Sequence, residues 1–81
     1  MEKELFTLKQ YGHIEIDLRK YMDKRQITRN ALARAIDTRF EVINKWYNGH
    51  VEKIDADILA RICFVLDCNP GDIIRYITKD D

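Results

Sequence analysis

Two short helical patterns, separated by only three residues, constrain this chain more than any other feature of its sequence. The first follows Thr28 and repeats apolar side chains at spacings of three and four residues. The second ends at Asn48-Gly49 and carries apolar side chains on one face, including Ile43 and Trp46. The link 37–39 is too short for the helices to lie alongside each other as a relaxed hairpin, so we expect them to cross steeply.

Residues with known capping preferences mark the ends of these two helices. The Thr28 hydroxyl can accept a hydrogen bond from an unpaired N–H of the first turn. Gly49 can adopt the left-handed conformation that commonly ends a helix. Trp46 shares a face with Ile43, which assigns the indole to the core. Together these signals indicate a helix-turn-helix.

The flanking sequence predicts the elements that brace this motif. Ile14-Glu15-Ile16 alternates apolar and polar residues, which favours a short strand. Asp17 is expected to cap a helix over about 18–25. Asp55 is expected to cap another over about 56–67, the most hydrophobic helix of the chain, whose apolar stripe includes Ile62, Val65 and Leu66.

The C-terminal part is predicted to contain a single helical turn and an extended segment. Asn69-Pro70 reads as a cap followed by proline at the first helical position. The segment 75–78 has strand-like composition and either extends from that turn or pairs with residues 14–16. We divide the chain into an N-terminal extension (1–13), a domain (14–78) and a solvated tail (79–81). The extension is either disordered alone or pairs with a partner chain.

Composition limits the function classes. The chain has 14 basic and 14 acidic residues in 81, so any nucleic-acid partner must be recognised through local charge. It contains no serine, no glycine-rich phosphate loop and no carboxylate and histidine grouping at catalytic spacing, which argues against an enzyme and implies no cofactor. No apolar run approaches the roughly 18 residues of a membrane helix.

The cysteines favour a cytoplasmic protein without a metal site. Cys63 and Cys68 follow no signal-like apolar run, which suits a reducing compartment. Two sulfurs are too few for a zinc site, and His13 and His50 lack the paired spacing that such a site needs. We expect both to be core or near-surface thiols.

One set of residues matches a known family pattern: Thr28, Leu32, Ala33, Ile43, Trp46, Asn48, Gly49 and Leu59. At these positions the chain resembles the Cro-type, lambda-repressor-like helix-turn-helix domains, also called the XRE family. The stretches 47–49, 53–63 and 68–74 resemble a small bacterial branch of that family. The resemblance covers about 14–76 and implies a compact, all-α, five-helix domain, with short N- and C-terminal extended segments as an option. It also implies a cytoplasmic DNA-binding transcriptional regulator that acts on two half-sites of duplex DNA, usually as a homodimer. The apolar run over 73–77 supports a dimer, because a small monomer cannot easily bury it.

The chain departs from the family pattern in the link. Asp37 stands where the family commonly has glycine, and aspartate tolerates the left-handed region better than most residues. Thr38 replaces a buried Val or Ile, and Arg39 replaces the usual Ser or Thr cap.

Carried over by position, the resemblance implies a set of DNA-contacting side chains. Glu41 would accept from cytosine, Asn44 would pair with adenine, and Lys45 would donate to guanine or phosphate. Phe40 would touch a thymine methyl group, or else pack on the core; Glu41 alternatively complements only the helix dipole. The base-reading set is Phe40, Glu41, Asn44 and Lys45 with Arg29 and Arg39 nearby, and the phosphate clamps are Asn48, His50 and Lys53.

A protein-binding adaptor or antitoxin-like module on the same scaffold is the alternative, since fold alone does not establish function. The neutral net charge favours it slightly. It predicts that the exposed face of the second helix lacks positive potential and that apolar surface appears elsewhere.

Overall fold

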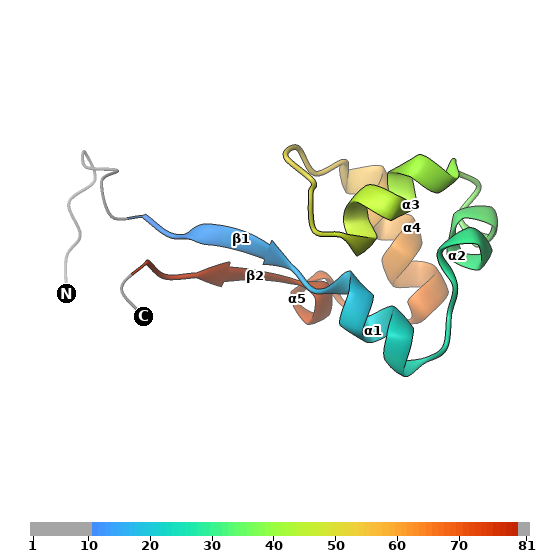
Figure 1. Cartoon of the computed structure of the whole chain (residues 1–81), viewed down its shortest axis with the longest axis horizontal. Coiled ribbons are helices and arrows are strands. Elements are labelled where there is room, and N and C mark those ends of the chain that lie inside the picture. The colour runs from blue at the N-terminus through green and yellow to red at the C-terminus, as the bar shows by residue number, and fades with distance from the viewer. Residues whose placement is uncertain (1–10, 80–81) are drawn as a thin grey trace.

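A computed structural model describes residues 11–79 as a helical body from which a two-stranded ribbon projects (Figure 1). Residues 1–10 and 80–81 lie outside the described part, so the N-terminal extension stays a prediction. In chain order the elements are β1 (His13–Ile16), α1 (Leu18–Lys24), α2 (Arg29–Ala35), α3 (Phe40–Tyr47), α4 (Ala56–Leu66), α5 (Pro70–Ile73) and β2 (Ile74–Ile77).

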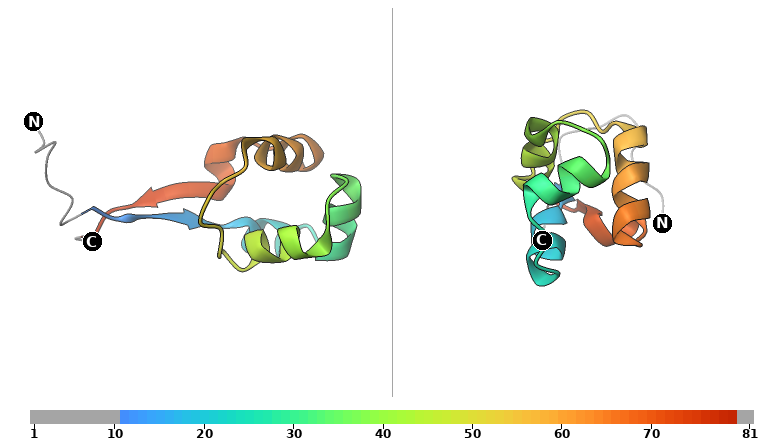
Figure 2. Two further views of the ribbon diagram at one scale, coloured as in Figure 1. Left: turned by 90° about the horizontal axis from the view of Figure 1, so that it is seen from above. Right: turned by 90° about the vertical axis from the view of Figure 1, so that its right-hand side faces the viewer.

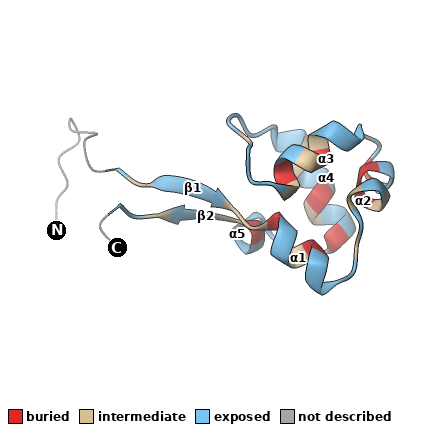
Figure 3. Cartoon of the chain, viewed as in Figure 1, coloured by how far each residue is buried: buried red, intermediate tan, exposed pale blue. Residues whose placement is uncertain are grey.

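Every one of the five helices contributes to a single apolar core (Figure 3). Ile43 and Trp46 turn inward from α3, which confirms the core assignment of the indole. Burying each large apolar side chain contributes about 1.5–3 kcal/mol. The core consists of Leu18, Met22, Leu32, Ala33, Ile36, Ile43, Trp46, Ile62, Leu66 and Ile73.

Four of the helices end in the same way, at a left-handed residue. At the end of α2, Thr38 N donates to Ala33 O (2.9 Å) and Asp37 N donates to Arg34 O (3.2 Å). This pair of backbone bonds satisfies carbonyls that the helix leaves unpaired. Asp37 has φ 58°, so it adopts the left-handed conformation expected of it. The corresponding residues at the ends of α1, α3 and α4 are Gln26, Gly49 and Asp67.

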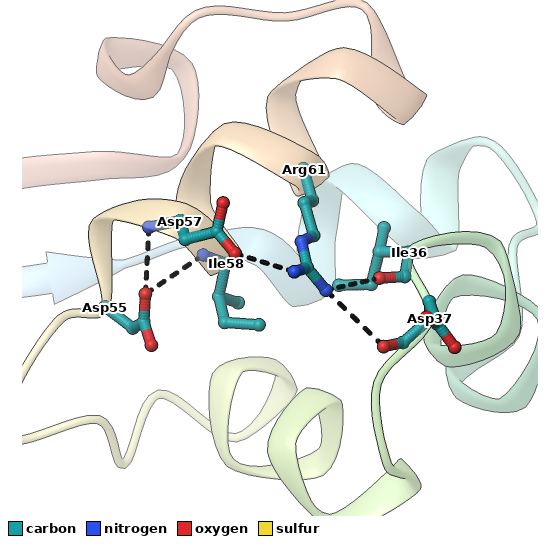
Figure 4. A network of polar contacts seen from close by, with 6 residues as sticks. All are labelled: Ile36, Asp37, Asp55, Asp57, Ile58 and Arg61. Atoms are coloured by element: carbon teal, nitrogen blue, oxygen red, sulfur yellow. Dashed lines mark hydrogen bonds and ion pairs between the residues drawn. The ribbon is translucent and has the colours of Figure 1, made fainter.

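An arginine of α4 supports the link between α2 and α3 (Figure 4). Arg61 Nη1 donates to Ile36 O (3.0 Å), at the end of α2, and contacts Asp37 O at 3.4 Å. Its other terminal nitrogen pairs with Asp57 at 2.7 Å. The α2 and α3 axes cross steeply when seen from above (Figure 2), as the short link predicts.

The prediction of an all-α domain is wrong in one respect, because β1 and β2 form a small sheet. β1 and β2 pair antiparallel, with Ile14 opposite Tyr76 and Glu15 opposite Arg75. The segment after α5 therefore does both things that were expected of it, extending the turn and pairing with residues 14–16. Gly12 is required beside this ladder, because a Cβ there would lie 1.6 Å from Ile77 O.

Two other sequence predictions need correction. Helix α1 starts where expected, but the Asp17 side chain does not cap it. That carboxylate instead accepts from Arg75 at 3.1 Å, because β2 brings the guanidinium beside the start of α1. Val65 is not in the core: it is 40% exposed, since α4 buries Ile62 and Leu66 on a narrower stripe. The caps at Thr28 and Asp55 are confirmed.

Replacing Asp37 by glycine should stabilise the fold. Glycine removes the left-handed strain at φ 58° without touching the backbone bonds, so Asp37→Gly should raise the free energy of unfolding by about 0.5–1 kcal/mol. Urea denaturation measures the change. As a control, Ala35→Gly in the last turn of α2 should lower the free energy of unfolding by a similar amount. If Asp37→Gly lowered the free energy of unfolding, that would contradict this account of the link.

Candidate nucleic-acid interface

Helix α3 presents a polar face to solvent because its apolar side is buried. Ile43 and Trp46 face the core, whereas Glu41, Lys45 and Asn48 are exposed. The buried residues fix the rotation of the helix about its axis, so they also fix the direction of the polar side chains. The helix begins at Phe40, with Arg39 as an extended N-cap residue whose side chain makes no capping hydrogen bond.

Seven of the nine predicted site residues fall into two groups on this surface. Arg39, Glu41 and Lys45 line a shallow hollow together with Val42. Two cations and one carboxylate thus follow one side of α3: Arg39 at its N-cap, Glu41 in its first turn and Lys45 in its last turn. Glu41 is also placed to complement the helix dipole.

The second group joins α2 to α3 around one guanidinium. Arg29 Nη1 donates to Asn44 Oδ1 at 2.7 Å, and Asn48 Nδ2 lies 3.4 Å from the same oxygen. The Arg29 guanidinium carbon lies 4.7 Å from the ring centroid of Tyr47 and 5.6 Å from that of Phe40. Phe40 is 39% exposed, so its ring lines one side of this cluster and is not part of the core.

Tyr47 is the member of the cluster that sequence reasoning missed. Its hydroxyl donates to Asp23 Oδ1 at 2.7 Å, and Arg19 lies 5.3 Å from its ring centroid. The ring therefore ties α3 to α1 through Asp23 and to α2 through Arg29. The helical period placed Tyr47 on the apolar side of α3 and gave no signal of its polar contacts, which come from residues more than 15 positions away.

The remaining predicted contacts, His50 and Lys53, lie beyond both groups. They are exposed in the loop between α3 and α4. The backbone N–H of His50 donates to Lys45 O at 2.9 Å, which completes the left-handed end of α3. Among the nine predicted residues, four basic side chains (Arg29, Arg39, Lys45 and Lys53) oppose the single carboxylate of Glu41. These nine residues therefore carry a net positive charge although the chain as a whole is neutral.

A reactive thiol, a metal site and a membrane-spanning helix receive little support from residues 11–79. Cys63 and Cys68 are half-buried free thiols. Burial and the adjacent Cys63 raise the pKa of Cys68 to about 11, so this thiol stays protonated, and hence weakly nucleophilic, at neutral pH. Within the described range there is no grouping of three or more metal-ligating side chains. None of the helices there has the length and apolar character needed to cross a membrane.

Comparison with known proteins agrees with this geometry. Residues 17–79 match a family model described as a Cro/C1-type HTH DNA-binding domain. A relative from Bacillus subtilis (strain 168), the uncharacterized HTH-type transcriptional regulator YozG, is 28% identical over 68 residues, covering 84% of this chain and 81% of that protein. The crystal structure of transcriptional regulator VanUg superposes with a TM-score of 0.65 at 22% identity, covering 95% of this chain and 99% of that one.

Proposed function

The chain belongs to the Cro/C1-type helix-turn-helix DNA-binding family, and on that basis we propose that it regulates transcription by placing α3 in the major groove of a specific duplex. The observation that carries this proposal is the outward face of α3, which is polar, locally basic and fixed in direction by the buried Ile43 and Trp46. A helix of this kind fits the major groove, where base edges present distinct donors and acceptors.

Within this proposal the predicted contacts divide into base-reading residues and phosphate-binding residues. Glu41 and Lys45 project from α3 toward base edges, and Asn44 adds its amide from the Arg29 cluster. Arg39 and Lys53 neutralise phosphate charge, and Asn48 and His50 donate hydrogen bonds to phosphate oxygens. All four set the register without reading sequence. This division predicts that the two sets respond differently to substitution.

The structure agrees with only one of the two features that the protein-binding alternative predicts. Apolar surface does occur away from α3, since Phe64 is 86% exposed beside Val65. The other expectation, a second helix without positive charge, fits poorly with Arg39 and Lys45 on its exposed side. DNA binding accounts for both the charge and the rigid arrangement of Arg29 and Asn44.

Selection from a pool of random duplexes at low salt tests the function, because phosphate contacts are strongest there. The protein should enrich one sequence motif. Lys53→Ala should then weaken binding to all sequences alike and reduce the slope of log K against log salt concentration by about one. Lys20→Ala, an exposed lysine of α1 outside the site, is the matched control and should leave that slope unchanged. Failure to enrich any sequence would refute the proposal.

We also propose that the protein acts as a homodimer, joined through the β1–β2 ribbon. Because side chains alternate across strands, Ile14, Ile16, Ile74 and Tyr76 share one face. Ile16 and Ile74 pack on the core, whereas Ile14 and Tyr76 remain 53% and 55% exposed.

A second copy suits this ribbon better than a charged partner does. Arg75 on the opposite face is already paired with Glu15 (3.0 Å) and Asp17 (3.1 Å), so the ribbon carries little unbalanced charge. An isolated two-stranded ribbon is also marginally stable in water. The ribbon projects away from α2 and α3 (Figure 1), so a copy bound there leaves α3 open. Two-fold symmetry would then match two half-sites about 34 Å apart.

Sedimentation equilibrium at high protein concentration tests the dimer. The unmodified chain should sediment as a dimer, and Ile14→Lys should convert it to a monomer, because a charge then lies in the apolar contact. Phe64→Lys removes an even more exposed apolar side chain from α4 and should leave the dimer intact. A monomeric parent protein, or dissociation by Phe64→Lys alone, would contradict the ribbon interface.

A further inference from the structure

The contact between Arg29 and Asn44 determines which part of the Asn44 amide is available to DNA. A guanidinium has five N–H donors and no acceptor, so the Asn44 atom 2.7 Å from Arg29 must be the oxygen. The Asn48 amide nitrogen lies 3.4 Å from the same oxygen and is a weaker second donor. Both acceptor positions of Asn44 Oδ1 therefore face donors within the chain. What remains for a ligand is the Nδ2 group with its two N–H donors.

Arg29 is held in place before any DNA arrives. Its guanidinium lies over the ring of Tyr47, at 4.7 Å from the centroid, and close to the ring of Phe40, at 5.6 Å. The Tyr47 ring is itself fixed by the hydrogen bond from its hydroxyl to Asp23. Arg29 is also half-buried, which limits the rotamers it can exchange with. The Asn44 oxygen therefore meets a preorganised donor.

We propose that Arg29 is a positioning residue that makes Asn44 a donor-only reader, so that Asn44 selects guanine in place of adenine. An asparagine pairs with adenine by accepting from N6 and donating to N7, which needs the oxygen that Arg29 occupies. Guanine instead presents two acceptors, O6 and N7, on its major-groove edge. This inference rests on the proposed function, since it names the base that one residue of α3 reads.

Base preference at a single position tests the inference. Asn44→Ala first identifies that position, because preference should relax at one base pair only. The parent protein should favour guanine over adenine there by about fivefold or more, the lower end of what one residue–base pairing provides. Arg29→Met keeps a long side chain over the two rings but has no donor, so it frees the acceptor position of Asn44 Oδ1 that Arg29 occupies. The preference of this variant should shift toward adenine by at least a similar factor.

Two further variants separate positioning from charge. Arg29→Lys retains a donor and should retain the preference for guanine. Arg34→Met removes the same charge from an exposed position of α2, and should leave the guanine-to-adenine ratio unchanged. In the free protein, Arg29→Met should also shift the NMR signals of the Asn44 side-chain amide, with thermal unfolding confirming that the variant is folded.

The possible results are distinct. A parent protein that favours adenine at the Asn44 position would overturn the inference. So would an Arg29→Met variant that loses affinity equally for both bases, or one whose Asn44 amide signals do not move. Absence of any enriched duplex for the parent protein would instead refute DNA recognition itself, and the inference would fall with it.

Discussion

The left-handed end of α2 at Asp37 is the constraint on which the rest of the molecule depends. Two backbone bonds, from Asp37 N and Thr38 N, close α2 and turn the chain within three residues. Arg61 then donates to the carbonyls of Ile36 and Asp37, which ties the turn to α4. If this turn relaxed, α3 would no longer cross α2 at the angle that brings Asn44 beside Arg29. The packing of α2 against α3 and the geometry of the candidate interface therefore both depend on this turn.

Rigid placement matters here because the chain has no excess of positive charge. With 14 basic and 14 acidic residues, long-range attraction cannot supply most of the affinity for DNA. Recognition has to come from a few side chains whose positions are set in advance. The Arg29 cluster meets that requirement, since aromatic rings and an amide oxygen hold the guanidinium before binding. A preorganised contact costs less conformational entropy when DNA binds.

Much of this arrangement could be predicted from the sequence, for physical reasons that are local. The 3.6-residue period located the helices, and the caps at Thr28 and Asp55 and the stop at Gly49 depend only on neighbouring residues. The ribbon was predicted only as one of two options, since pairing β1 with β2 requires the core to bring distant ends together. Asp17 was misjudged for the same reason, because its partner Arg75 is 58 residues away.

The sequence predicted the candidate site as a set of residues, but it did not predict the contacts among them. The family resemblance placed Arg29 and Asn44 on one surface, yet it gave no sign that they bond to each other or that Tyr47 supports them. Such contacts depend on the crossing of α2 and α3 and on side-chain rotamers, which periodicity does not specify. The sequence also assigned Val65 to the core, because a helical period cannot show how wide the buried stripe is.

The most direct test of this account is NMR titration of the protein with the enriched duplex, cut to one half-site. The largest shifts in backbone amide signals should fall in the first turn of α2, along α3 and in the loop that carries His50 and Lys53, while the outer surface of α4 around Phe64 stays unchanged. Largest shifts around Phe64, with α2 and α3 unaffected, would contradict the claim that α3 is the DNA-reading element.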